Sequence, residues 1–223
     1  MGQDFSQLRH AMVEGQVRVA DVSDRALLAA MREVPREMFV PSRLRPLAYI
    51  DEDILLNEGD DVARYMMEPA AFARLVQLAE VRPGDLVLDI GCGTGYSSAI
   101  LSRLAGAVIA LECDEGLAAR ATDILSAQGF DSVAVVTGPL ADGLAEEGPF
   151  DVVFVGGAVD FVPDALLAQI KPEGRLVAVK GHGLTGAAML HLRDDEGILS
   201  SRRAFNCAVK PLPGFESKPE FVF

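Results

Sequence analysis

Seven consecutive residues carry the clearest signal for chemistry in this chain: Asp89-Ile90-Gly91-Cys92-Gly93-Thr94-Gly95. Glycines let the backbone turn sharply and approach a ligand closely, because no Cβ stands in the way. Glu112 follows about 20 residues after the first glycine, a spacing at which a carboxylate on the next strand accepts both hydroxyls of a ribose. Together the turn and the acid predict a site for an adenosyl ligand.

The spacing of the glycines favours one adenosyl ligand over others. The pattern is G-x-G-x-G rather than the G-x-G-x-x-G that lays a pyrophosphate on a helix N-terminus. No Gly-Lys-Ser/Thr follows the turn, which argues against a phosphate-binding P-loop. S-adenosylmethionine has no phosphate, but its ammonium and sulfonium groups favour acidic and carbonyl neighbours. We therefore predict that S-adenosylmethionine binds here, with Asp89 toward its ammonium end and Glu112 toward its ribose.

The residues expected to contact the cofactor include both acids and their neighbours. They are Asp89, Gly91, Cys92, Gly93, Thr94, Gly95, Tyr96, Glu112 and Cys113. Two structural alternatives remain open from the residues alone. Asp89 could cap the turn, and Glu112 could be a solvated acid at a strand end.

The elements that must position these residues are short apolar runs separated by helical segments. Strands are predicted at 86–90, 107–112, 132–137, 150–156 and 175–180, and helices at 70–80, 114–128 and 163–170. Apolar runs of this length are typical of parallel strands buried on both faces. Two late segments, 187–193 and 203–209, are predicted to form an antiparallel hairpin through Asp194-Asp195-Glu196-Gly197. The fold class is therefore α/β, a doubly wound and mostly parallel seven-stranded sheet whose ligand lies at the carboxyl ends of its strands.

The first part of the chain is predicted to be a helical cap on this sheet. Residues 5–40 have helical spacing of apolar positions, with a capped start at Asp21-Val22-Ser23-Asp24, and residues 39–61 read as a loop. We expect one domain over 1–223, divided into a cap over 1–69 and a cofactor-binding core over 70–223. The apolar tail from Leu212 to Phe223 is expected to dock against the body or to touch a second subunit.

Composition excludes several classes of protein. The chain has 223 residues, a formal net charge of −13 and a pI near 4.6, which argues against a nucleic-acid partner because phosphate binding depends on Lys and Arg. The basic segment 32–45 is interleaved with acids and is interpreted as a solvated helix face. No apolar run is long enough for a membrane span, and no secretory signal starts the chain, so a cytoplasmic location is expected. Three scattered cysteines predict neither a disulfide framework nor a metal site.

Beyond the glycine turn, the sequence resembles the protein-L-isoaspartate O-methyltransferase family along most of its length. The segments that carry the resemblance are Met12-Val13-Glu14-Gly15-Gln16-Val17-Arg18, the stretch from Ala30 to Pro41, Leu47-Ala48-Tyr49, the stretch from Val87 to Ala99, and Gly148-Pro149-Phe150-Asp151. The N-terminal segments discriminate best, because many methyltransferases share the glycine turn.

The resemblance implies a Rossmann-like methyltransferase fold and an S-adenosylmethionine-dependent O-methyltransferase that acts in protein repair. Such an enzyme methylates the free carboxylate of isoaspartyl residues in aged proteins or peptides and releases S-adenosylhomocysteine. A monomer or weak homodimer without membrane or nucleic-acid partners is expected. Two alternatives stay open, a cofactor-binding protein without catalysis and a methyltransferase with a different acceptor.

Where the family places threonine and serine donors before a proline, this chain reads Arg64-Tyr65-Met66-Met67-Glu68-Pro69. Tyr65 stands at the threonine position and Met67, which cannot donate a hydrogen bond, at the serine position. Arg64 and Tyr65 could form a different carboxylate clamp, since arginine is a charged, bidentate donor. Equally, Arg64 could be a solvated loop residue and Tyr65 a core aromatic.

Two further segments complete the expected site. Gly138, Pro139 and Leu140 match a family segment near the adenine, although Pro139 replaces an acid there. His182 follows the predicted strand 175–180 between two glycines, where it could orient a substrate at the carboxyl edge of the sheet.

Overall fold

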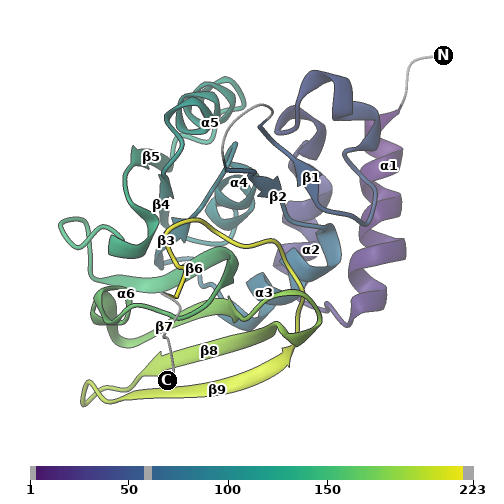
Figure 1. Ribbon diagram of the computed structural model, residues 1–223. Helices are drawn as coiled ribbons and strands as arrows, with labels where there is room; N and C mark the ends of the chain where they lie inside the picture. Colours follow the sequence, from purple (N-terminus) through teal and green to yellow (C-terminus); the bar gives the residue numbers. More distant parts are fainter. Residues whose placement is uncertain (1–3, 58–61, 218–223) are drawn as a thin grey trace, which may run out of the picture.

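A seven-stranded sheet is the central layer of the computed structural model, which describes residues 4–57 and 62–217 (Figure 1). In spatial order the strands are β5 (Val133–Thr137), β4 (Ala107–Glu112), β3 (Leu86–Ile90), β6 (Phe150–Val159), β7 (Ile170–Lys180), β8 (Ala187–Arg193) and β9 (Leu199–Asn206). Neighbours from β5 to β7 are parallel, whereas β8 and β9 extend one edge as an antiparallel hairpin. The predicted fold class is confirmed.

Helices cover both faces of this sheet. Side chains of β6 alternate between two hydrophobic clusters, with Val152 and Phe154 in one and Val153 and Val155 in the other. The first cluster also contains residues of α3 (Pro69–Ala79), α4 (Tyr96–Ser102), α5 (Glu115–Ala127) and the N-terminal helices. The second contains residues of α6 (Asp164–Ala168) and of the C-terminal tail. Burial on both faces explains why the parallel strands read as continuous apolar runs.

Three strands differ in length or position from the prediction. β6 continues to Val159 and β7 begins at Ile170, because their pairing resumes across register shifts that a short apolar run does not reveal. β9 begins at Leu199 and ends at Asn206, so the predicted strand 203–209 was placed too late. The turn closes early, with Asp194 N donating to Ile198 O at 3.0 Å, and pairing starts at once between Arg193 and Leu199.

The N-terminal part is helical, as predicted. α1 (Phe5–Met12) continues into a π turn (Val13–Val17) and a 3-10 turn (Arg18–Ala20), and α2 (Arg25–Glu33) follows. Asp24 caps α2 by accepting from Leu27 N at 3.0 Å. The predicted loop 39–61 also contains a 3-10 turn (Ser42–Leu47) and the short strand β1 (Ile54–Leu55).

The interpretation of segment 32–45 as a solvated helix face was wrong at Arg36, whose side chain is fully buried. Its Nε donates to Ala48 O and its Nη2 to Met67 O, both at 2.8 Å. The guanidinium also lies over the Tyr96 ring, 4.7 Å from the ring centroid. Carbonyl oxygens and a π face thus replace water around the charge, and Arg36 links the N-terminal part to the segment before α3.

The described part of the C-terminal tail docks against the sheet. Leu212 and Phe215 are buried, and backbone bonds of 2.9 Å join Leu212 N to Ala158 O and Ala158 N to Lys210 O. The tail's last aromatic residues, Phe221 and Phe223, lie outside the described residues. Within the described ranges, the helices are too short or too polar to cross a membrane.

We predict that Arg36→Met lowers the free energy of unfolding by roughly 3 kcal/mol, because two buried carbonyls lose their donor. Urea unfolding followed by circular dichroism measures the change. Arg25→Met, at an exposed position in the first turn of α2, serves as the matched control and should lie within about 0.5 kcal/mol of the parent. Equal stability of the two variants would contradict the linking role of Arg36.

Candidate functional site

The glycine turn connects the carboxyl end of β3 to α4. Gly91, Gly93 and Gly95 have φ angles of 79°, 58° and 93°, a region that other residues rarely adopt. Gly95 directly precedes α4 at its N-cap position, and the buried Thr94 donates its hydroxyl to Phe39 O. The turn is therefore fixed both by its own conformation and by the N-terminal part of the chain.

Asp89 lies fully buried beside this turn. Its Oδ2 accepts hydrogen bonds from Ser97 Oγ and Ser98 Oγ, each at 2.6 Å. Its Oδ1 is buried without a hydrogen-bond partner in the described structure. Burial raises the pKa of Asp89 to about 6, although the hydrogen bonds from the two serine hydroxyls act in the opposite direction and lower it. An unpaired buried carboxylate oxygen suits the ammonium group of the expected cofactor.

Glu112 ends β4 and is also fully buried, so the alternative of a solvated acid was wrong. Its Oε2 accepts from Gly93 N at 2.7 Å, and its Oε1 accepts from Cys113 N at 2.9 Å and Asp114 N at 3.1 Å. Oε1 also forms an ion pair with Nη1 of Arg64. Asp89 and Glu112, the two acids predicted from the sequence, therefore lie at one edge of the sheet, where β3 and β4 end side by side.

Arg64 is 3% exposed, so the alternative of a solvated loop residue was wrong as well. Besides Glu112, its guanidinium contacts the glycine turn, with Nη2 donating to Gly91 O at 3.2 Å. Its backbone is held at both ends, because its N donates to Asn57 Oδ1 and its O accepts from Leu56 N, each at 2.8 Å. Arg64 thus lies across the turn immediately before β2 (Tyr65–Met66), which pairs with β1.

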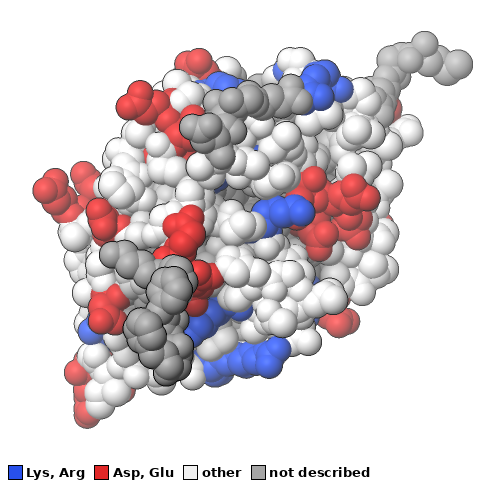
Figure 2. Space-filling model, viewed as in Figure 1, with Lys and Arg blue, Asp and Glu red and all other residues white. Residues whose placement is uncertain are grey.

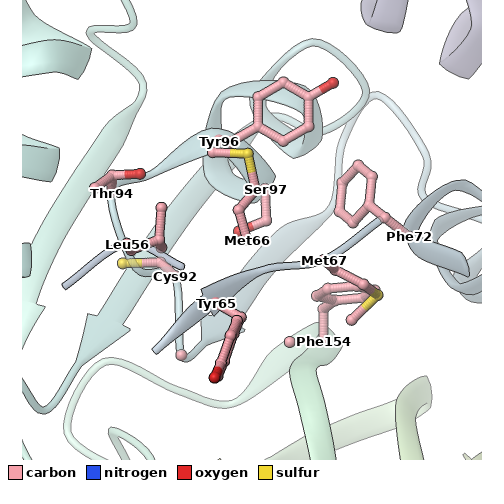
Figure 3. Close-up of a pocket in the computed structure, with 12 residues that line it drawn as sticks. Leu56, Tyr65, Met66, Met67, Phe72, Cys92, Thr94, Tyr96, Ser97 and Phe154 are labelled. Atoms are coloured by element: carbon pink, nitrogen blue, oxygen red, sulfur yellow. The ribbon is translucent and has the colours of Figure 1, made fainter. Parts of the chain in front are cut away.

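A small apolar pocket adjoins the turn (Figure 3). Met66, Met67, Phe72 and Phe154 face one another across it, and Ser97 lies on its α4 side. The cavity measures about 30 Å³, roughly the share of one water molecule in the liquid. Sites for ligands of cofactor size usually measure about 300 Å³ or more. This pocket alone is therefore smaller than the cofactor, whereas a separate cavity of about 320 Å³ shares Leu56 with it and is also lined by Asn57 and Asp114.

Tyr65 is half-buried at the edge of this pocket, and its hydroxyl points away from the other labelled side chains (Figure 3). A second, smaller cavity shares Tyr65 and Met67 with the first and is also lined by Asp53 and Lys210. The Lys210 ammonium lies 5.4 Å from the centroid of the Tyr65 ring. Nothing in the sequence indicated Lys210, because its place at the pocket depends on the tail folding back over β6.

The remaining predicted residues divide into neighbours of the turn and outliers. Cys92 and Tyr96 line the pocket and are buried, whereas Cys113 is exposed beside Glu112. Gly138 donates its N–H to Glu112 O at 3.0 Å, which brings the segment Gly138, Pro139 and Leu140 to the edge of the site. The Leu140 side chain, however, is buried in the second hydrophobic cluster, so only its backbone faces the edge.

His182 lies elsewhere along the carboxyl edge. Its ring forms an exposed contact with Asp160, the residue after β6. Asp160 also accepts from Ser217 N at 2.6 Å, so the same carboxylate binds both His182 and the C-terminal tail. The structure thus groups His182 with the tail rather than with the residues that line the pocket.

Comparisons with known proteins agree on one family. A model described as protein-L-isoaspartate(D-aspartate) O-methyltransferase matches residues 7–215. The protein-L-isoaspartate O-methyltransferase of Roseiflexus castenholzii is 36% identical over 211 residues, which cover 95% of this chain and 94% of the relative. The corresponding protein of Koribacter versatilis is 35% identical over 210 residues, covering 94% and 92%.

Solved structures give the same result for the fold. One named protein-L-isoaspartate O-methyltransferase superposes with a TM-score of 0.80 at 25% identity, covering 92% of this chain and 66% of that one. A Plasmodium falciparum protein assigned to the same activity, solved with S-adenosyl-L-homocysteine, gives a TM-score of 0.75 at 19% identity, covering 91% and 96%. The second likeness supports the fold alone.

The raised pKa of Asp89 predicts a pH-dependent affinity for S-adenosylhomocysteine. With a pKa of about 6, the carboxyl group is mostly neutral at pH 5 and ionised at pH 7. The ammonium group of the ligand favours the ionised form, so we expect calorimetric affinity to fall about tenfold from pH 7 to pH 5.

Asp89→Asn should bind more weakly at pH 7 and show a flat profile. Asp123→Asn, on the exposed side of α5, should keep the slope of the parent. A slope that persists in Asp89→Asn would assign the titration to another group.

Proposed function

Since this chain belongs to the protein-L-isoaspartate(D-aspartate) O-methyltransferase family, we propose that it methylates the free carboxylate of isoaspartyl residues in damaged proteins or peptides. The membership confirms the family resemblance predicted from the sequence. It favours this activity over the two alternatives, a cofactor-binding protein without catalysis and a methyltransferase with a different acceptor.

One observation carries the proposal: two buried carboxylates flank a glycine turn at the carboxyl ends of β3 and β4. When bound, S-adenosylmethionine supplies a methyl group on a positively charged sulfur that a carboxylate oxygen can attack. Glu112 would accept the ribose hydroxyls, and the unpaired Oδ1 of Asp89 would accept from the ammonium group. The backbone at Gly91 and Gly93 lets the ligand approach closely.

The acceptor side needs placement rather than acid or base catalysis. A carboxyl group with a pKa near 4 is already ionised at neutral pH, so its oxygen attacks without losing a proton. In-line placement against the methyl group then accounts for most of the rate. Met66, Met67, Phe72 and Phe154 line the pocket with apolar side chains, which would disfavour water there and so strengthen the attraction between the charged reactants.

Donors for the acceptor carboxylate must come from residues other than Met67. Tyr65, which lines the pocket, and Arg64, which contacts Gly91 at its edge, are the proposed donors, and Lys210 adds positive charge at the neighbouring cavity. Elsewhere the visible face carries groups of acidic side chains with fewer basic ones among them (Figure 2). A cation at the pocket therefore offsets a field that would otherwise repel an anionic acceptor. His182 has no proposed role in the transfer.

The surroundings of the reaction follow from the same features. The three cysteines are free thiols, which suits the reducing cytoplasm that we infer as the location. The net charge of −13 suits a protein or peptide acceptor better than a nucleic acid.

The decisive measurement is transfer of a labelled methyl group from S-adenosylmethionine to an isoaspartyl peptide, with the matching aspartyl peptide as control. We expect label in the isoaspartyl peptide alone. Binding of the cofactor without transfer to any isoaspartyl peptide would refute the proposed acceptor.

The role of Glu112 is tested by Glu112→Gln, which keeps the shape of the side chain and removes its charge. We expect at least a tenfold loss of calorimetric affinity for S-adenosylhomocysteine, since charged acceptors bind hydroxyls more strongly than neutral ones. Glu115→Gln, an exposed position in the first turn of α5, should match the parent. An unchanged affinity in Glu112→Gln would remove the ribose contact from the proposal.

A further inference from the structure

Arg64 occupies Glu112, one of the two acids assigned to the cofactor, and also contacts the glycine turn. Its guanidinium is paired with Glu112 and donates to Gly91 O at 3.2 Å. We propose that Arg64 exchanges partners during the reaction cycle, from Glu112 before the cofactor binds to the acceptor carboxylate afterwards. The inference rests on the proposed function, and it adds an order of binding to it: cofactor first, acceptor second.

The cofactor and Arg64 would compete for the same space and the same hydrogen bonds. Nη2 of Arg64 lies 3.2 Å from the position that a Cβ on Gly91 would take, so the guanidinium shares the space beside the glycine with the closer Leu212 side chain. Oε1 of Glu112 already accepts from Arg64 and from the backbone N–H groups of residues 113 and 114. A cofactor whose ribose binds Glu112 would therefore compete with Arg64 for Oε1.

The side chain of Arg64 can move while its backbone stays in place. Asn57 Oδ1 and Leu56 N fix the two backbone polar groups of Arg64, each at 2.8 Å. Neither bond involves the guanidinium. Rotation about the side-chain bonds therefore releases Glu112 without unpairing β1 and β2.

Once released from Glu112, the Arg64 guanidinium needs another anion as its partner. A buried charge without a partner is strongly unfavourable. Tyr65, the next residue, lies at the pocket where the acceptor would bind, and Met66, Met67, Phe72 and Phe154 offer no counter-charge there. Asp53, at the second cavity, accepts from Glu68 N at 3.0 Å and already has the positive charge of Lys210 nearby. The acceptor carboxylate would supply two oxygens to the planar fork of the arginine.

This exchange makes each ligand favour the other. Acceptor binding removes the unpaired charge that cofactor binding leaves, so the coupling is reciprocal. It also assigns a role to Arg64, which directly precedes the segment in which Tyr65 and Met67 replace the family's threonine and serine donors.

The test uses calorimetry with the full chain, S-adenosylhomocysteine and an isoaspartyl peptide. In the parent protein we expect the peptide to bind at least tenfold more tightly when S-adenosylhomocysteine is present. Arg64→Met should bind S-adenosylhomocysteine severalfold more tightly and lose the tenfold gain for the peptide. Arg120→Met is the matched control, because Arg120 donates to Leu56 O at 3.1 Å on the same segment without touching Glu112. It should keep the coupling.

Circular dichroism shows whether Arg64→Met folds. If it does not, Arg64→Lys, which keeps the charge beside Glu112 but loses the fork, should retain S-adenosylhomocysteine binding and weaken the coupling severalfold. The exchange would be overturned if S-adenosylhomocysteine left the peptide affinity of the parent unchanged. It would also be overturned if a folded Arg64 variant kept the full tenfold gain in peptide affinity. Methyl transfer with either result would leave the proposed function standing, whereas a parent that binds no S-adenosylhomocysteine would refute that function and the exchange with it.

Discussion

A guanidinium taken out of water must be surrounded by oxygens, and three buried arginines impose that requirement on this chain. Arg36 draws the carbonyls of Ala48 and Met67 together, and Arg64 draws Glu112 to the glycine turn. Arg175, on β7, donates to Ala79 O and Glu80 O at the end of α3 and pairs with Asp85 just before β3. Each arginine joins segments that are distant in the sequence, because no local stretch supplies enough acceptors. The site therefore depends on charge satisfaction as much as on apolar packing, and loss of one arginine exposes several unpaired groups at once.

Much of the fold could be predicted because its signals are local. The apolar runs of β3 and β4 identified strands buried on both faces, and their order along the chain gave a parallel, doubly wound sheet. The placement of Asp89 and Glu112 followed from the same logic, since the carboxyl ends of neighbouring parallel strands meet at one edge. The bounds of β9 could not be obtained this way. Its start is fixed by the backbone bond of Asp194 to Ile198, and its residues are mostly exposed, so their pattern carries little hydrophobic signal.

The partners of the buried arginines and the position of Lys210 could not be predicted for a different reason. In the sequence, Arg36 stands in the same mixed-charge pattern as a solvated arginine, and only the tertiary fold brings carbonyls to it. Arg64 was recognised as a candidate donor, but its pairing with Glu112 spans 48 positions and has no sequence signature. Lys210 reaches Tyr65 through the path of the tail. The roles of Arg64, Tyr65 and Lys210 toward an acceptor, like the division into a cap and a core, stay predictions.

The glycine turn also contacts distant parts of the chain, because Gly91 and Gly93 have no side chains and leave space beside the turn. A Cβ on Gly91 would lie 2.7 Å from Leu212 of the tail, and a Cβ on Gly93 would lie 2.6 Å from Leu56. Leu212 and Leu56 therefore occupy space that these glycines leave open, at positions whose positive φ angles already favour glycine. Sequence variation at 56 and 212 is thereby constrained by a motif from which both are remote in the chain.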